Sequence, residues 1–141
     1  MSEITVRVAD WTIDNAEIRR IRETVFVAEQ AVPPELEWDA DDERAVHFLA
    51  YERDYPIGTA RLLNDGHIGR VSVLRDWRGL HVGEALMHAA VREAEAKGVR
   101  EQWLTAQVHA SSFYERLGFT IVSDEFLEAG IPHVEMVRRS A

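Results

Sequence analysis

The middle of the chain carries a run of strand-like segments, joined by tight turns, that passes directly into a helical pattern. Residues 47–52 and 57–63 have strand character and are separated by a proline-containing turn at 54–56. The Asn-Asp-Gly sequence at 64–66 is a strong turn signal and leads into a further strand over 67–74. Because such short turns reverse the chain between neighbours, these segments predict a three-stranded antiparallel meander.

Helices are expected on both sides of the meander. Apolar residues at helical spacing predict a helix over 81–97, which Gly98 ends. Upstream, a helix is expected to begin near Asp14, because Asp14 and Glu17 have the spacing of a capping box. This helix should fade before the two prolines at 33–34.

The ends of the chain supply further strands and one short helix. Alternating apolar residues predict a strand over 4–8, and a short strand is expected over 101–106. A helix over 110–117 should precede strands over 119–122 and 133–137. The order of elements predicts an α+β fold with a single mixed, mostly antiparallel sheet flanked by helices. A length of 141 residues fits one domain spanning 1–141.

Composition excludes several classes of function. The chain has no cysteine, which rules out disulfides, cysteine-ligated metals and a covalent cysteine intermediate. Its net charge of −9 makes it a poor binder of nucleic acid, although a local anion site built from backbone amides stays possible. No apolar run approaches the ~20 residues that span a bilayer, and the N-terminus lacks the pattern of a secretory signal. The expected location is therefore the cytoplasm.

The junction between the third meander strand and the next helix has the chemistry of an anion site. Amides at a helix N-terminus attract phosphate, and Gly79 and Gly83 allow a close approach. Arg78 could add a charge-assisted contact. The segment is neither a Walker loop nor a Rossmann fingerprint. Taken alone, two glycines at a strand–helix junction are more often a plain tight turn.

Two motifs in the expected order resemble the GCN5-related N-acetyltransferases. Residues 78–83 resemble that family's Arg/Gln-x-x-Gly-x-Gly/Ala pyrophosphate loop, and residues 107–119 resemble its Asn-x-x-Ala-x-x-Phe-Tyr-x-x-x-Gly-Phe segment. The resemblance implies the family's fold and acetyl-CoA as acyl donor. The donor-binding residues that it implies are Val71, Ser72, Val73, Arg78, Gly79, Leu80, His81, Val82, Gly83 and Gln107.

The chain departs from the family pattern at two positions. His81 stands where the family has its middle glycine, and Gln107 stands where it has asparagine. The detailed contacts of the loop are therefore open. Residues 25–47 and 130–136 resemble the ElaA-like branch of the family, so the likeness extends over almost the whole chain.

Tyr114 is the candidate general acid. The sequence alone favours a tyrosine that completes the core. The resemblance reverses this, because tyrosine at this position of the family commonly protonates the departing thiolate. His109 could cap the short helix or border the acyl pocket.

An acceptor pocket is predicted from segments that would frame it in this family. Its residues are Glu29, Asp39, His47 and His133, with Glu29 as first and His133 as second candidate for the general base. A helix end, an acidic loop and two strand ends explain the same residues without a pocket. These candidates lack the His-x-x-x-His or Glu-x-x-His spacing of a metal site, so no metal is expected.

The resemblance implies an acyl-CoA N-acyltransferase that transfers acetyl to a small amine by direct attack in a ternary complex. The alternative from another class is a degenerate domain that binds acyl-CoA as a sensor. Synthases of homoserine-lactone signals are a second alternative, with only a loose likeness near residues 25–26. The expected partner is a small-molecule amine, with no nucleic acid or membrane; a homodimer is left open.

Overall fold

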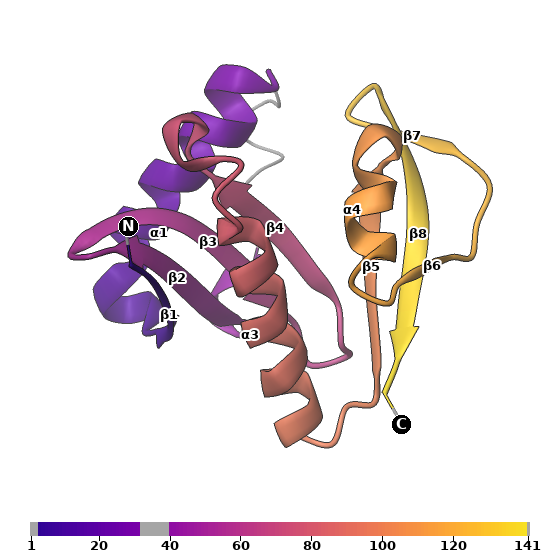
Figure 1. The fold of residues 1–141 in the computed structure, drawn as a ribbon, viewed down its shortest axis with the longest axis horizontal. Coiled ribbons are helices and arrows are strands. Elements are labelled where there is room, and N and C mark those ends of the chain that lie inside the picture. Colours follow the sequence, from indigo (N-terminus) through magenta and orange to yellow (C-terminus); the bar gives the residue numbers. More distant parts are fainter. Residues whose placement is uncertain (1–2, 32–39, 141) are drawn as a thin grey trace.

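The computed structural model describes residues 3–31 and 40–140, which form strands and helices in alternation (Figure 1). The strands are β1 Ile4–Ala9, β2 Val46–Glu52, β3 Tyr55–Leu62, β4 Ile68–Val73, β5 Glu101–Gln107, β6 Thr120–Ile121, β7 Phe126–Glu128 and β8 Ile131–Arg139. The helices are α1 Trp11–Arg22, a π-helical continuation Glu23–Glu29 (η1), α3 Val82–Ala96 and α4 Ser111–Glu115. Single 3₁₀ turns lie at Ala40–Glu43, Arg75–Trp77 and Val108–Ala110.

The first helix begins four residues earlier than the sequence pattern indicates. Asp10, not Asp14, is the N-cap, and its carboxylate accepts hydrogen bonds from the amides of Thr12 and Ile13. Asp14 lies in the first turn and accepts from the amide of Asp10 at 2.9 Å. The prediction of a cap at Asp14 was wrong because Asp10 offers the same capping chemistry one turn upstream.

The α+β fold is confirmed, and its sheet is split into two halves. Strands β1, β2, β3 and β4 pair antiparallel in that order, which confirms the predicted meander. In the other half β8 pairs antiparallel with β5, β6 and β7. In the described residues a single parallel bridge, His67–Trp103, links the halves. The expectation of one continuous sheet therefore needs correction.

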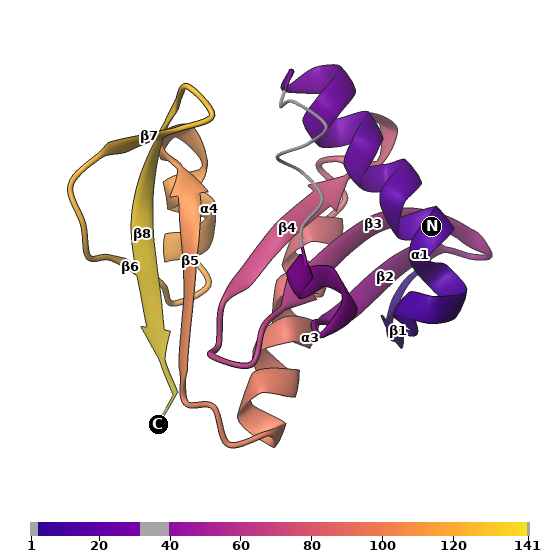
Figure 2. The same ribbon diagram turned by 180° about the vertical axis from the view of Figure 1, so that it is seen from behind.

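The two halves diverge from this bridge toward the ends of β4 and β5 (Figures 1 and 2). Helices α3 and α4 cover one face of the sheet, and α1 with η1 covers the opposite face. At the bridge the rings of His67 and Trp103 stack with centroids 3.9 Å apart. This contact sets the vertex from which the strands separate.

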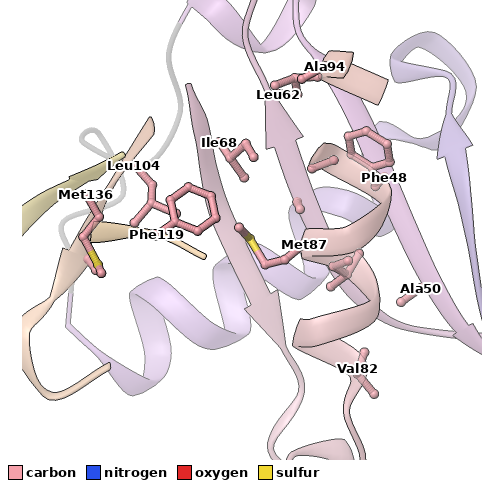
Figure 3. Close-up of a cluster of buried hydrophobic side chains, with 14 of the residues drawn as sticks. Phe48, Ala50, Leu62, Ile68, Val82, Met87, Ala94, Leu104, Phe119 and Met136 are labelled. Atoms are coloured by element: carbon pink, nitrogen blue, oxygen red, sulfur yellow. The ribbon is translucent and has the colours of Figure 1, made fainter. Parts of the chain in front are cut away.

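A common hydrophobic core holds the halves together despite the split. Phe48, Ile68 and Met87 from the N-terminal half pack in one cluster with Leu104 and Met136 from the C-terminal half (Figure 3). Burying side chains of this size stabilises the fold by about 1.5–3 kcal/mol each. The opening between β4 and β5 is thus a feature of a well-packed molecule.

A buried group of charged side chains supports the start of η1. We call Arg22, His47, Asp42 and Arg61 the ionic cluster. The Asp42 carboxylate accepts from Arg22 at 2.8 Å and from Arg61 at 3.0 Å, and all four residues are at most 3% exposed. The ring of His47 stacks on Trp11 with centroids 4.5 Å apart. These contacts tie α1, β2 and β3 together.

Candidate functional site

Strand β4 presents free backbone to the opening between the two sheet halves. Val73 stands opposite Gly58 in the register, and the next amide, that of Leu74, donates to Ile57 at 2.9 Å. In an antiparallel ladder the polar groups of Val73 therefore point away from β3. Its carbonyl accepts from Arg78 Nε at 2.9 Å, which agrees with this direction. The Val73 amide faces the opening.

A β-bulge lies in β4 just before Val73 in the chain. Thr59 pairs with Ser72 and Arg61 pairs with Gly69, so two residues of β4 stand opposite Ala60. One of them, Arg70, has a left-handed backbone with φ of 52°. A bulge of this kind bends the strand and increases its local twist. It thus contributes to the divergence of β4 from β5.

The loop after β4 delivers the N-terminus of α3 to the same opening. Gly79 has φ of 79°, and a side chain added there would meet nothing within 4 Å. His81 is the N-cap in a left-handed conformation, with φ of 64°, and gives the helix no side-chain cap. The amides of the first turn lack intrahelical acceptors. The helix start therefore offers both hydrogen-bond donors and a positive dipole end.

The opening is a cleft of about 680 Å³ that reaches both faces of the sheet. Most of the residues predicted to hold the donor line it. The predicted residues that line the cleft are Val71, Val73, Arg78, Gly79, His81, Val82 and Gly83. Three predicted residues are not part of this lining: Ser72 is buried, Leu80 is exposed on the loop, and Gln107 lies at the end of β5. The cleft wall opposite α3 comes from α4 and includes Phe113 and Arg116.

The side chain of Arg78 is committed to Glu29. Its guanidinium contacts the two carboxylate oxygens of Glu29 at 2.9 and 3.1 Å, and Arg75 lies 3.9 Å from the same carboxylate. This pair joins the end of η1 to the loop that precedes α3. Glu29 is largely buried under these contacts, so it is not a free base in this structure.

Gln107 likewise has both ends of its side-chain amide engaged. Its Nε2 donates to Gln30 Oε1 at 3.0 Å, and its Oε1 accepts from His109 Nε2 at 2.6 Å. We call Gln30, Gln107 and His109 the amide relay. Gln30 and His109 line the cleft. Gln107, predicted as a donor ligand, is instead the centre of a link between the two sheet halves.

Tyr114 packs at the inner side of α4. Its ring makes edge contacts with Phe113 and Phe119, at centroid distances of 5.0 and 6.3 Å. Burial raises the pKa of the Tyr114 phenol to about 12. Among the residues that the structure describes, we find no hydrogen-bond partner for its hydroxyl. The phenol therefore carries its proton at neutral pH and has a free donor.

Of the four residues predicted for an acceptor pocket, three lie in the described part of the chain, and each has contacts of its own. Asp39 lies outside the described residues. His47 is 1% exposed, and its Nε2 lies 2.7 Å from the Asp42 carbonyl, so it belongs to the ionic cluster. Burial lowers the pKa of His47. Glu29 pairs with Arg78, and His133 lies on β8. Of the predicted group, His47 is thus the member that the structure places in the core instead of at a pocket.

His133 has a defined tautomer. Its Nδ1 lies 2.6 Å from the Ile131 carbonyl, which can only accept, so Nδ1 carries the hydrogen. In the neutral ring Nε2 then holds the lone pair, 3.4 Å from Glu128. His133 is also the register partner of Gln107. Paired residues share one face of a sheet, so His133 neighbours the amide relay.

Sequence reasoning missed several cleft residues. Val25 lies on η1, Gln30 directly follows η1, and Arg116 directly follows α4. The apolar periodicity of 18–28 could have indicated that Val25 faces inward, but no local pattern places Gln30 beside Gln107, because they are far apart in the chain. In the described residues no group of three or more His, Cys, Asp or Glu could hold a metal ion. None of the described helices is long and apolar enough to cross a membrane.

Comparison with known proteins agrees with this geometry. The model of the acetyltransferase (GNAT) domain family matches residues 12–140. YjcF of Bacillus subtilis, named as an uncharacterized N-acetyltransferase, is 38% identical over 122 residues, which cover 84% of this chain and 87% of YjcF. The protein ElaA of Escherichia coli is 34% identical over 128 residues, which cover 84% of this chain and 83% of ElaA.

Solved structures show the same similarity. The crystal structure of Escherichia coli ElaA superposes with a TM-score of 0.84 at 30% identity, covering 99% of this chain and 100% of ElaA. An acyl-CoA N-acyltransferase from Pseudomonas aeruginosa gives a TM-score of 0.81 at 30% identity, covering 98% and 99% of the two chains. The chain therefore belongs to the GNAT acetyltransferase family, in the ElaA-like branch.

Proposed function

We propose that the protein transfers an acetyl group from acetyl-CoA to a small amine by direct attack in a ternary complex. The observation that carries this proposal is the cleft between β4 and β5. It combines free amides at the start of α3 with the free Val73 amide of an open strand edge. Phosphate binding needs the first feature, and thioester polarisation needs the second.

The donor would lie along β4 with its pyrophosphate at the α3 N-terminus. The absence of a side chain at Gly83 leaves room there, because an added Cβ would stand only 3.5 Å from Phe113 on the opposite wall. Arg116 also lines the cleft and adds a positive charge on that wall. The Val73 amide, one strand residue before the loop, would then donate to the thioester oxygen as the amine attacks.

Tyr114 would stabilise the leaving sulfur of the donor. A phenol with a pKa near about 12 is a weak acid, and a thiol has a pKa of about 8.5, so complete proton transfer to the thiolate is uphill. A hydrogen bond from the hydroxyl to the developing thiolate needs no such transfer. We therefore assign Tyr114 first as a hydrogen-bond donor to the sulfur, with the proton following as the products separate.

The acceptor amine must lose a proton before or during attack. Glu29 was the first candidate for this role, but Arg78 occupies both of its oxygens. His133 donates from Nδ1 to the Ile131 carbonyl, presents Nε2 toward Glu128 at 3.4 Å, and neighbours the amide relay. His133 is therefore the better candidate base, and Glu29 is better explained as the partner that positions Arg78.

Free thiol release from acetyl-CoA across a panel of small amines tests this function. The chain has no cysteine, so the protein adds no background to a thiol reagent. We expect amine-dependent release with at least one acceptor class, together with acetyl-CoA binding by calorimetry. Binding without turnover for any amine would favour the sensor. Absence of both would reject the proposal.

A further inference from the structure

The amide relay crosses the cleft at a defined depth. From the parallel bridge His67–Trp103, four residues lead along β5 to Gln107, an advance of about 13 Å. Because the bulge adds one residue to β4, the same advance on that strand takes five residues and ends at Ser72. Gln107 therefore lies level with Ser72, where the strands have separated, and about one residue, roughly 3 Å, deeper than Val73.

The relay spans the cleft from one sheet half to the other. Gln30 follows η1, on the face opposite α3, while Gln107 ends β5 and His109 begins the link to α4. Gln107 bonds both neighbours, at 3.0 and 2.6 Å, so its side chain is fixed in place. The relay thus forms a wall at the deep end of the cleft. This wall consists of hydrogen-bonded side chains and not of backbone.

The composition of the cleft determines which end of a donor meets this wall. Charged and polar groups, including Arg78, Arg116 and the α3 amides, gather at the loop end. Beyond Val73 the lining includes Val25 and Val71, which are apolar. An acyl-CoA bound with its phosphates at the loop and its thioester at Val73 must point its acyl chain at the relay.

We infer that the amide relay limits the length of the acyl chain that the cleft accepts. This inference rests on the proposed function and specifies its donor. The short stretch between Val73 and the relay leaves room for an acetyl group, whereas a six-carbon chain would have to displace Gln30 or Gln107. Removing either amide should open the deep end toward the η1 face.

The test is calorimetric binding of acetyl-CoA and hexanoyl-CoA to the wild type, Gln30→Ala and Gln107→Ala. We expect the wild type to bind acetyl-CoA at least tenfold more tightly than hexanoyl-CoA. Each variant should reduce that ratio at least fivefold, mainly through tighter hexanoyl-CoA binding. Asn15→Ala is the matched control, because it removes an amide that donates to the carbonyls of its own helix, at Trp11 and Thr12.

The outcomes separate this inference from the proposed function. If folded variants bind acetyl-CoA and keep the wild-type ratio, or if the wild type already binds both donors equally, the inference is wrong and the function stands. If the wild type binds no acyl-CoA, both are wrong. Gln30 follows η1 outside the core, so Gln30→Ala keeps the test available should Gln107→Ala fail to fold.

Discussion

Two groups of polar side chains lie at opposite ends of η1, and they differ in how completely the protein encloses them. The ionic cluster at its start is buried, and its groups bond one another within the core. The amide relay and the Arg78–Glu29 pair at its end face a cleft. Buried, mutually bonded groups act on stability, whereas groups beside open backbone can act on a ligand. For these two groups at the ends of η1, enclosure therefore separates the structural from the ligand-facing side chains better than residue type does.

The largest expected effect concerns the stability of the ionic cluster. Asp42→Ala removes the carboxylate shared by Arg22 and Arg61 and should lower the free energy of unfolding by about 3–5 kcal/mol. Asp41→Ala is the control, because its pair with Arg44 is exposed and should contribute at most about 1 kcal/mol. Urea denaturation measures both. Equal losses from the two variants would show that enclosure is not the deciding property.

Tyr114→Phe should act on turnover and leave stability nearly unchanged. The change removes the donor to the sulfur but keeps the ring that contacts Phe113 and Phe119. We expect turnover to fall about a hundredfold, the low end for acid catalysis, since the raised pKa makes the phenol a weak acid. Acetyl-CoA affinity should stay at the wild-type level. Tyr51→Phe provides the control, because the Tyr51 hydroxyl accepts from Arg7 at the surface.

Full activity of Tyr114→Phe would remove the tyrosine from the mechanism. A loss of stability with unchanged turnover per folded molecule would assign it to the core instead. Steady-state kinetics and thermal melting on the same preparations distinguish these results.

The ionic cluster should also make stability depend on pH. Burial lowers the pKa of His47 below its ordinary value of 6.5, so the unfolded chain takes up a proton more readily than the folded protein does. The free energy of unfolding should therefore be highest above about pH 6.5 and fall as the pH drops toward 5. Urea melts across this range should show a smaller slope for His47→Gln.

Two histidines serve as references for that slope. His67 is half-buried, and desolvation lowers its pKa too, so His47→Gln should reduce the slope without abolishing it. His88 is half exposed on α3, and His88→Gln should leave the slope close to that of the wild type. An unchanged slope in His47→Gln would mean that its buried ring does not govern the acid sensitivity.

The smallest effect is expected at the loop position that departs from the family pattern. His81 has a left-handed backbone and an exposed side chain that pairs with Glu84. His81→Gly should relieve the backbone and change donor affinity by less than about twofold, because the amides stay in place. Ala129 also has a left-handed backbone, so Ala129→Gly measures how much the relief of the backbone alone changes donor affinity. A tenfold loss of acetyl-CoA affinity in His81→Gly would mean that the ring contacts the phosphates.

Local chemistry explains which parts of the fold could be predicted from sequence. The turn at 64–66 and the glycines of the loop act within a few residues, so the meander and the α3 start were predictable. Capping chemistry is also local, but Asp10 and Asp14 offered two solutions and the pattern favoured the wrong one. β7 was missed because only three residues form it, and they pair with β8.

The candidate site also has a part that local sequence predicts and a part that depends on long-range contacts. The donor loop follows from contiguous residues, and most of them line the cleft. The acceptor candidates came from separate segments, and their surroundings depend on long-range packing. His47 is buried because Trp11 stacks on it and Asp42 bonds it, and neither contact is visible in the residues around His47. The relay was equally hidden, since Gln30 and Gln107 meet only when the sheet halves do.

The central claim is that the cleft holds the donor's pyrophosphate at the start of α3, and acetyl-CoA affinity of Gly83 variants tests it most directly. An added Cβ at Gly83 makes ordinary contacts with Phe113 and Val73, so Gly83→Ala should fold, and Gly83→Val extends further into the cleft. Gly69→Ala is the control, because its Cβ meets only His67 at 3.7 Å or more. By calorimetry we expect wild-type affinity for Gly69→Ala, a weaker value for Gly83→Ala and a loss of at least tenfold, about 1.4 kcal/mol, for Gly83→Val. Wild-type affinity in a folded Gly83→Val would place the donor elsewhere and contradict the account.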